Sequence, residues 1–184
     1  MRILILPGYG GSGPNHWQSR WQGQNPEWQR FSPRDWDAPA LAEWRTALDL
    51  AVDAEPEPPL LVAHSLSCLL VGHWGATRRQ AVRGAFLVAP PDPDAPIFPA
   101  EAASFTPAPQ EKLPFPALLV ASTNDSYGSA EFAQSLAEAY GAWFLSLGPL
   151  GHINTESGHG DWPEGLGLLT TFAENLNAYS SPSQ

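Results

Sequence analysis

Five short apolar runs, each bounded by Gly, Pro or polar residues, limit most strongly how this chain folds. The runs are continuous rather than alternating, which is typical of parallel strands that are covered on both faces. A sixth and weaker candidate strand lies at Trp28–Ser32. The five runs are Arg2–Leu6, Leu60–Ala63, Ala85–Ala89, Ala117–Ala121 and Trp143–Ser146.

Helical patterns lie between these runs. In three segments the apolar residues recur at helical spacing, while Leu66–Ala76 is apolar nearly all round and therefore predicts a buried helix. Strands that alternate with helices predict βαβ units. We expect one α/β domain over all 184 residues, a three-layer sandwich with a mostly or fully parallel sheet of about six strands. The three segments are Pro39–Asp53, Ser129–Tyr140 with Ser129 as its N-cap, and Glu164–Ala178.

A proline-rich segment interrupts the alternation at residues 90–116. It holds nine of the twenty prolines, which excludes helix over most of its length. Two interpretations stay open for it, an ordered surface loop and a small lid over a site. A linker between domains is less favoured, because the strand pattern resumes at Ala117. We expect residues 180–184 to form a flexible tail.

The composition argues against several classes of partner and compartment. A formal net charge of −10, with Lys112 as the single lysine, disfavours nucleic acid and anionic membrane surfaces. The single Cys68 excludes an internal disulfide and any multi-cysteine zinc site. The first apolar run ends at Pro7-Gly8, too early for a signal peptide, and no later stretch approaches the roughly 18 apolar residues of a spanning helix. We expect a cytoplasmic protein.

The stretch from Leu60 to Leu69 indicates the chemistry of the protein most strongly. It combines an expected buried strand, a sharp turn with Ser65 at its apex and an expected buried helix. This is the setting of a nucleophile elbow, in which a strained backbone exposes the serine hydroxyl above the sheet. The elbow needs small residues two positions before and after the serine, and Ala63 and Ser67 stand where glycine is usual. Taken alone, such a turn is more often a helix N-cap.

Two further residues lie where an elbow-type catalytic triad needs them. Asp125 follows the fourth apolar run, although an Asn-Asp pair also commonly starts a turn. His152 lies in a glycine-bracketed loop before the last expected helix, and the chain order Ser65, Asp125, His152 is the order of this architecture. We therefore predict these three as nucleophile, acid and base, with Asp161 and Asp92 as other candidates for the acid.

The glycine-rich loop after the first apolar run is the expected second half of an oxyanion hole. One donor should be the N–H of Leu66, directly after the nucleophile, and the other the N–H of Tyr9 or Gly8. Phosphate or dinucleotide binding is disfavoured, because no Gly-Lys-Ser/Thr follows and the Gly-x-Gly-x-x-Gly spacing is not matched. The spacing of His152 and His159 does not suit two metal ligands on one helix face. We expect neither a cofactor nor a metal.

Four stretches carry motifs that occur together in one family. They are Pro7-Gly8-Tyr9-Gly10-Gly11-Ser12 with His16-Trp17-Gln18, Ala63-His64-Ser65-Leu66, Ser122-x-Asn124-Asp125-x-Tyr127, and Gly151-His152-Ile153-Asn154 with Ser157-Gly158-x-Gly160-x-Trp162-Pro163. Through these motifs the chain resembles the small YdeN-like, retinoblastoma-binding-type serine hydrolases over residues 3–165. The resemblance implies a compact α/β-hydrolase fold without a large cap, and the same roles for Ser65, His152 and Asp125.

Three positions depart from the pattern of that family. Ser67 stands where the family often has glycine, which could crowd the elbow or tighten its geometry. Ser126 stands where a proline often follows the acid, a change that should affect the loop rather than the chemistry. The Leu-x-Cys-x-Glu segment that links some members to retinoblastoma protein ends here in Leu70, so that partner is not carried over.

The other histidines and tryptophans carry weaker signals. His16 is expected to orient or cap a neighbouring element, or to line the pocket and bind substrate together with Trp17. Trp21 and Trp162 are further candidates for shaping a pocket. His64, inside the elbow, is expected to pack near the turn.

These observations predict hydrolysis of a small ester or related acyl bond through an acyl-enzyme. The alternative from another class is a protein that keeps the fold but acts as a ligand- or protein-binding module. A dinucleotide-binding oxidoreductase ranks third, because it rests on the glycine-rich loop alone. The expected partner is a small-molecule acyl substrate, and the sequence leaves a protein partner and the oligomeric state open.

Overall fold

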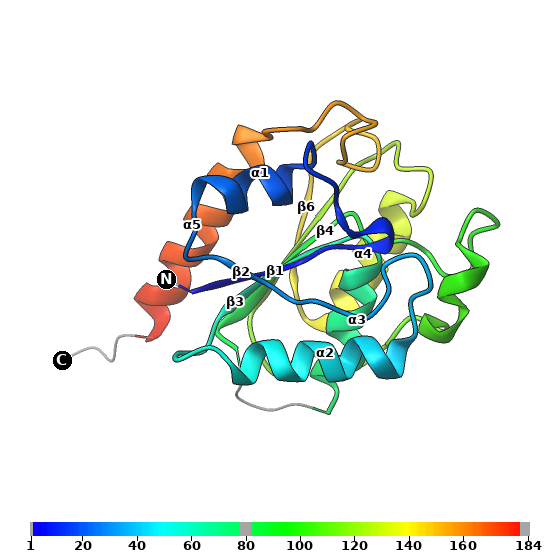
Figure 1. Ribbon diagram of the computed structural model, residues 1–184. Helices are drawn as coiled ribbons and strands as arrows, with labels where there is room; N and C mark the ends of the chain where they lie inside the picture. The colour runs from blue at the N-terminus through cyan, green and yellow to red at the C-terminus, as the bar shows by residue number, and fades with distance from the viewer. Residues whose placement is uncertain (1, 78–81, 181–184) are drawn as a thin grey trace.

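A parallel β-sheet forms the centre of the protein (Figure 1). The computed structural model describes residues 2–77 and 82–180. Within them the sheet has six strands in the order β2-β1-β3-β4-β5-β6, and every neighbouring pair is parallel, which confirms the predicted architecture. The strands are β1 (Ile3–Leu6), β2 (Gln29–Arg30), β3 (Leu60–His64), β4 (Gly84–Val88), β5 (Ala117–Ala121) and β6 (Trp143–Ser146).

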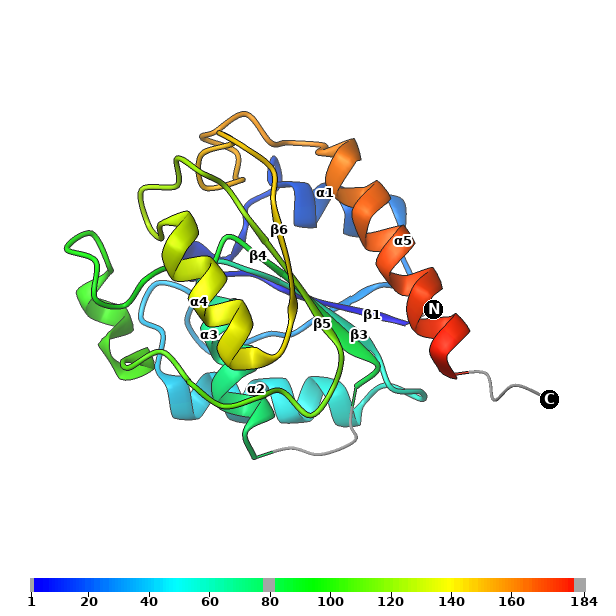
Figure 2. The same ribbon diagram turned by 180° about the vertical axis from the view of Figure 1, so that it is seen from behind.

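Helices cover both faces of the sheet, as Figures 1 and 2 show. The first layer consists of α1 (Trp17–Gln24) and α5 (Pro163–Ser180), and the second of α2 (Leu41–Asp53), α3 (Leu66–Gly75) and α4 (Ala130–Tyr140). Two apolar clusters, one on each side of the sheet, form the core. No helix among the described residues is long and apolar enough to span a membrane.

The predicted helices form for the reasons that the sequence suggested. In α2 the side chains of Trp44, Leu48 and Val52 are buried at helical spacing. Helix α4 begins where Ser129 Oγ accepts a hydrogen bond from the Phe132 N–H, at 3.1 Å. Helix α3 is buried on nearly every side, so its orientation is fixed by packing rather than by an amphipathic pattern.

Helix α1 is not predicted from the sequence. This helix buries Trp17, Gln18 and Trp21, but its other residues are polar or glycine, so it lacks a clear apolar stripe. Its N-cap is His16, whose Nδ1 accepts from the Gln18 N–H, at 3.2 Å. His16 was expected to orient or cap a neighbouring element, and it does cap α1, but histidine is not among the usual capping residues and so did not mark the start of a helix.

The proline-rich segment is ordered and attached to the core. It contains the 3₁₀ helix η2 (Ala100–Phe105), which lies in the stretch without proline between Pro99 and Pro107. Ala102 and Phe105 of this helix are fully buried in the cluster that covers the α2–α3–α4 face. The tail expected at residues 180–184 lies, beyond Ser180, outside the described residues.

The order of the strands creates one crevice at the carboxyl edge of the sheet. From β1 the chain continues to β2 on one side, whereas β3 and all later strands lie on the other side. The loops that follow β1 and β3 therefore lead to helices on opposite faces, α1 and α3. The first of these loops contains the 3₁₀ helix η1 (Tyr9–Gly11). Ligands of open parallel sheets bind at such a switch point.

The N-cap of α4 provides a test of this local structure. Ser129→Ala should lower the free energy of unfolding by about 1 kcal/mol, because the first turn of the helix loses its capping acceptor. Ser135→Ala, an exposed serine within the same helix, should change it by no more than about 0.5 kcal/mol. Urea denaturation of both variants measures the difference, and equal losses would contradict the capping role.

Candidate active site

Ser65 lies at the sharp turn between β3 and α3. Its backbone angles are φ 54° and ψ −125°, a conformation that residues other than glycine rarely adopt. The Ser65 N–H donates to the Val88 carbonyl at 2.9 Å, and the Cys68 N–H donates to the Ser65 carbonyl at 2.8 Å. The Ser65 side chain makes no capping hydrogen bond to α3 and lines a cavity instead. The turn thus has the geometry of an elbow rather than of an N-cap.

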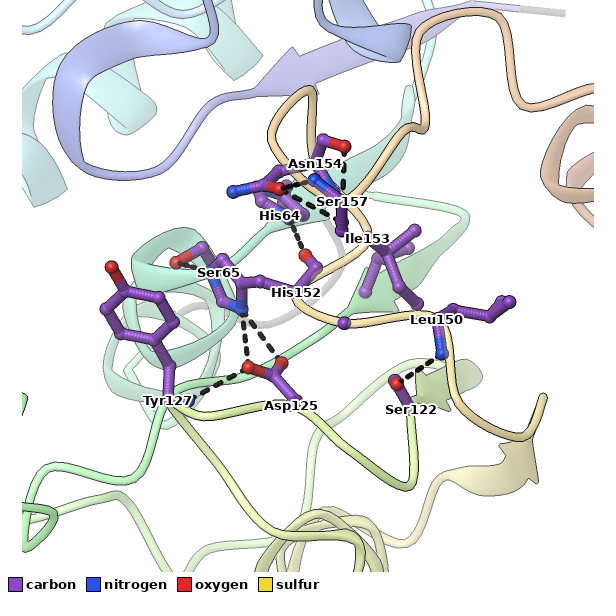
Figure 3. Close-up of polar contacts among 12 residues, drawn as sticks. His64, Ser65, Ser122, Asp125, Tyr127, Leu150, His152, Ile153, Asn154 and Ser157 are labelled. Carbon is purple, nitrogen blue, oxygen red and sulfur yellow. Dashed lines mark hydrogen bonds and ion pairs between the residues drawn. The ribbon is translucent and has the colours of Figure 1, made fainter.

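The side chains of Ser65, His152 and Asp125 form a continuous hydrogen-bonded chain (Figure 3). His152 Nε2 lies 2.9 Å from Ser65 Oγ, and His152 Nδ1 lies 2.8 and 3.0 Å from the two carboxylate oxygens of Asp125. The Tyr127 N–H donates to Asp125 Oδ1 at 2.9 Å, which orients the carboxylate. In such a chain the imidazole can accept the serine proton while the carboxylate holds the proton on Nδ1.

The loops after β5 and β6, which carry the carboxylate and the imidazole, are bonded to each other. Ser122 Oγ accepts from the Leu150 N–H at 2.9 Å, a bond drawn in Figure 3. Asn124 Oδ1 accepts from the Gly151 N–H at 2.7 Å. These two bonds fix the separation of the loops, so the contact between Asp125 and His152 does not depend on their own side chains alone.

The histidine loop is also bonded to residues outside its own strand pair. His64 Nε2 donates to the His152 carbonyl at 2.9 Å, and Trp17 Nε1 donates to the Ile153 carbonyl at 2.8 Å. Ile153 is fully buried and has a φ of 47°, an outlier for a β-branched residue. The two bonds hold this strained backbone in place beside His152. Sequence reasoning placed His64 near the turn but did not find this role.

Trp17 does not contact the cavity, which corrects its prediction as a substrate-binding residue. Its side chain is fully buried, and its ring packs against those of Trp21 and Trp162 at centroid distances of 4.5 and 5.2 Å. Trp21 and Trp162 are buried as well and stack at 5.9 Å. The three indoles share one apolar cluster between the sheet and the α1–α5 layer. Because these three indoles are buried there, none of them lines the cavity.

His16 caps α1 and also lines the cavity. Its ring packs edge-on against that of His64, with centroids 4.7 Å apart. Burial, and then the nearby charges of Arg30 and His152, lowers the pKa of His16 to about 3. Burial is also the main cause that lowers the pKa of His64 well below its ordinary value. Both imidazoles are therefore neutral at neutral pH, and His152 has no cationic histidine beside it.

The glycine-rich loop after β1 touches the elbow. A Cβ atom on Gly8 would lie 2.8 Å from Ser65 Cβ and 3.0 Å from the His64 carbonyl oxygen, so only glycine fits at this position. Tyr9 starts η1 and Leu66 starts α3, and an N–H at the first position of a helix has no acceptor within it. Both of these residues line the cavity. Their N–H groups are thus free of helix hydrogen bonds next to Ser65.

A cavity of about 510 Å³ surrounds Ser65 and His152 at the carboxyl edge of the sheet. One part of its wall is apolar and comes from the proline-rich segment, while the loops after β1 and β6 provide a polar part. The apolar part includes Pro91, Ile97, Phe98 and Pro99, and the polar part includes Ser12, His16, Asn154, Thr155 and Glu156.

The side chains of the other candidate acids make no hydrogen bond to Ser65 or His152 among the described residues. Asp161 forms a surface ion pair with Arg20, at 2.9 Å. Asp92 accepts a hydrogen bond from the Asp94 N–H, at 2.9 Å, within its own turn. Among residues 2–77 and 82–180, no group of three or more His, Cys, Asp or Glu is placed to hold a metal ion.

Comparisons with solved structures find proteins of the same fold. The chain is similar to a YdeN-like hydrolase from Pectobacterium atrosepticum, with 32% identity, 95% of this chain and 91% of that chain covered, and a TM-score of 0.85. It is similar to the ydeN gene product of B. subtilis, with 22% identity, 94% and 98% of the chains covered, and a TM-score of 0.77. A monoacylglycerol lipase from Paleococcus ferrophilus has the same fold, with 14% identity, 97% and 95% coverage, and a TM-score of 0.72.

The family comparison covers nearly the whole chain. A search of curated proteins gives no match. The model of the serine hydrolase family, in contrast, matches residues 3–171, which include the elbow and both loops that carry the polar residues of the site. With its fully parallel sheet and its close structural relatives, the chain belongs to the serine hydrolase family, as a small YdeN-like member of the α/β-hydrolase superfamily.

Proposed function

We propose that this serine hydrolase cleaves a small ester or related acyl bond through an acyl-enzyme on Ser65. The observation that carries the proposal is the hydrogen-bonded chain from Ser65 through His152 to Asp125, with 2.9 Å between His152 Nε2 and Ser65 Oγ. A cavity opens directly at the hydroxyl, so an acyl group has room to reach it. Family membership supports hydrolysis, and the geometry of the site supports serine as the nucleophile.

In the first half of the reaction, Ser65 Oγ attacks the carbonyl carbon while His152 Nε2 takes its proton. The carboxylate of Asp125 keeps the Nδ1 proton in place and stabilises the imidazolium that forms. When the tetrahedral intermediate collapses, the imidazolium returns its proton to the leaving alcohol. This leaves an acyl group esterified to Ser65.

The negative charge that develops on the carbonyl oxygen needs donors that are already in place. The N–H groups of Leu66 and Tyr9 fit this role, because neither is used by its own helix and both residues lie at the cavity. Each donor of this kind typically stabilises the transition state by about 3 kcal/mol. Water then attacks the acyl-enzyme, again with His152 as base, and Ser65 is regenerated.

Reaction with a fluorophosphonate, measured by mass spectrometry of the intact protein, tests the nucleophile. The wild-type protein should carry one adduct, because a serine paired with a base is activated toward such reagents. Ser65→Ala and His152→Ala should carry none, whereas Ser135→Ala, which removes an exposed serine on α4, should react like the wild type. A folded wild-type protein without an adduct would contradict the proposal and favour the binding-module interpretation.

Substitution of Asp125 tests its proposed role as the acid. Asp125→Asn should lower kcat for a nitrophenyl ester by about a thousandfold or more, because an amide favours the wrong tautomer of His152. Asp161→Asn, which removes a carboxylate in a surface ion pair, should stay within about twofold of the wild type. Steady-state kinetics compares the two variants. An unchanged rate in Asp125→Asn would show that the acid lies elsewhere.

The electrostatic surroundings of the cavity favour substrates without negative charge. Among the described residues that line the cavity, Glu156 is the one acidic side chain. Desolvation, and then the carboxylates of Glu101, Asp37 and Asp35, raises the pKa of Tyr9 at the same cavity. No lysine or arginine lines the described part of the wall. An anionic group on the substrate would therefore meet repulsion without a cation to offset it.

Matched esters measure this preference. kcat/KM should be higher for 4-nitrophenyl hexanoate than for mono-4-nitrophenyl adipate, and higher for methyl 4-acetoxybenzoate than for 4-acetoxybenzoate. Glu156→Gln should raise kcat/KM for at least one anionic member about two- to fivefold, as expected for removing about 1 kcal/mol of repulsion near water. Glu174→Gln, an exposed carboxylate on α5, is the control. Equal rates within both pairs, unaffected by Glu156→Gln, would contradict the preference.

A further inference from the structure

Ser67 connects the first turn of α3 to the loop after β1. Its side chain is fully buried, and its hydroxyl donates a hydrogen bond to the Pro7 carbonyl at 2.5 Å, across 60 residues of sequence. Serine hydroxyls in helices commonly bond to the backbone of their own helix. The Ser67 hydroxyl instead bonds to a carbonyl outside α3, and so joins two segments that meet at the site.

The bond reaches the loop close to the N–H group that serves as oxyanion donor in the proposed mechanism. Pro7 stands two residues before Tyr9, and Gly8 between them lies against the elbow. Among the described residues, the Ser67 bond is the one hydrogen bond that joins residues 7–9 to the elbow at residues 64–67. The near half of the loop is therefore fixed to the nucleophile by this bond and by van der Waals contact.

The far half of the same loop has separate anchors. The Gly10 N–H donates to the Trp36 carbonyl at 3.1 Å, and Arg30 donates to the Gly11 carbonyl at 3.0 Å. Without the Ser67 hydroxyl, the loop would keep these bonds and its place in the fold. The backbone between Pro7 and Gly10, which includes the N–H of Tyr9, would gain conformational freedom.

We propose that Ser67 is a positioning residue of the oxyanion hole. Its hydrogen bond to Pro7 sets the separation of the two donors, because Leu66 precedes Ser67 on α3 and Tyr9 follows Pro7 in the loop. Donors of an oxyanion hole are effective because they need no reorganisation during the reaction. The proposal rests on the proposed function, since it takes the N–H groups of Leu66 and Tyr9 as the two donors.

The test compares Ser67→Ala with Ser67→Cys, and uses Ser135→Ala as a control. In Ser67→Ala, kcat/KM for a nitrophenyl ester should fall about tenfold with KM within about twofold, less than the effect of deleting a donor itself. Ser67→Cys should lie between this variant and the wild type, because a thiol is a weak donor of similar size. The control should match the wild type in all measurements.

Affinity for a trifluoromethyl ketone separates positioning from general stability. Such a ketone adds to the serine and places an oxyanion in the hole, so its affinity follows transition-state stabilisation. Across the variants, its inhibition constant should rise by the same factor by which kcat/KM falls. A merely structural role would lower the melting temperature without this proportional loss.

Each outcome supports or overturns the positioning role of Ser67. Unchanged kcat/KM and ketone affinity in Ser67→Ala would overturn the proposal, and so would a fall in kcat/KM without a matching loss of ketone affinity. If Ser67→Ala does not fold, Ser67→Cys and Ser67→Gly give the same comparison. A folded wild-type protein that does not bind the ketone would contradict the proposed function instead, which distinguishes the two failures.

Discussion

The strained turn at Ser65 is the constraint on which the rest of the site depends. A serine with a φ of 54° stays in this conformation only because its surroundings hold it there. They do so through the Val88 carbonyl on β4 and through α3, which is buried on nearly every side. The turn also opens where the strand order reverses, between loops that lead to opposite faces of the sheet. The sheet thus determines where the Ser65 hydroxyl lies, and the loops of the site are arranged around it.

Three loops converge on this point, and the neighbours of Ser65 bind two of them directly. His64 bonds to the carbonyl of His152 in the histidine loop, and Ser67 bonds to the carbonyl of Pro7 in the loop after β1. The loop that carries the carboxylate is bonded to the histidine loop in turn, as Figure 3 shows. Hydrogen bonds from one short segment, residues 64–67, therefore set the positions of Ser65, the histidine loop and the loop after β1 relative to one another. Because the fold has no large cap, few other elements are available to hold these loops in place.

The sequence predicted most of the fold because continuous apolar runs and helical spacing are strong local signals. All six strands lie where the runs are, and the elbow residues follow from the strand–Ser–helix pattern. Helix α1 was missed, since its cap is a histidine and most of its surface is polar. Trp17 was misplaced because the composition of a segment does not reveal which way a side chain faces. The bonds made by His64 and Ser67 join distant segments, and no local pattern encodes such contacts.

The glycine positions around an elbow are not equivalent in physical terms. At Gly8 a single added carbon would meet the backbone and side chain of the elbow at 2.8 to 3.3 Å, so the requirement is for no side chain at all. At Ser67 a small side chain is buried without any such conflict, and its hydroxyl finds an acceptor in the Pro7 carbonyl. The limit there is one of volume rather than of backbone conformation, since Ser67 lies in the regular helix α3. The serine adds a directional hydrogen bond at a position where glycine would offer only van der Waals contact.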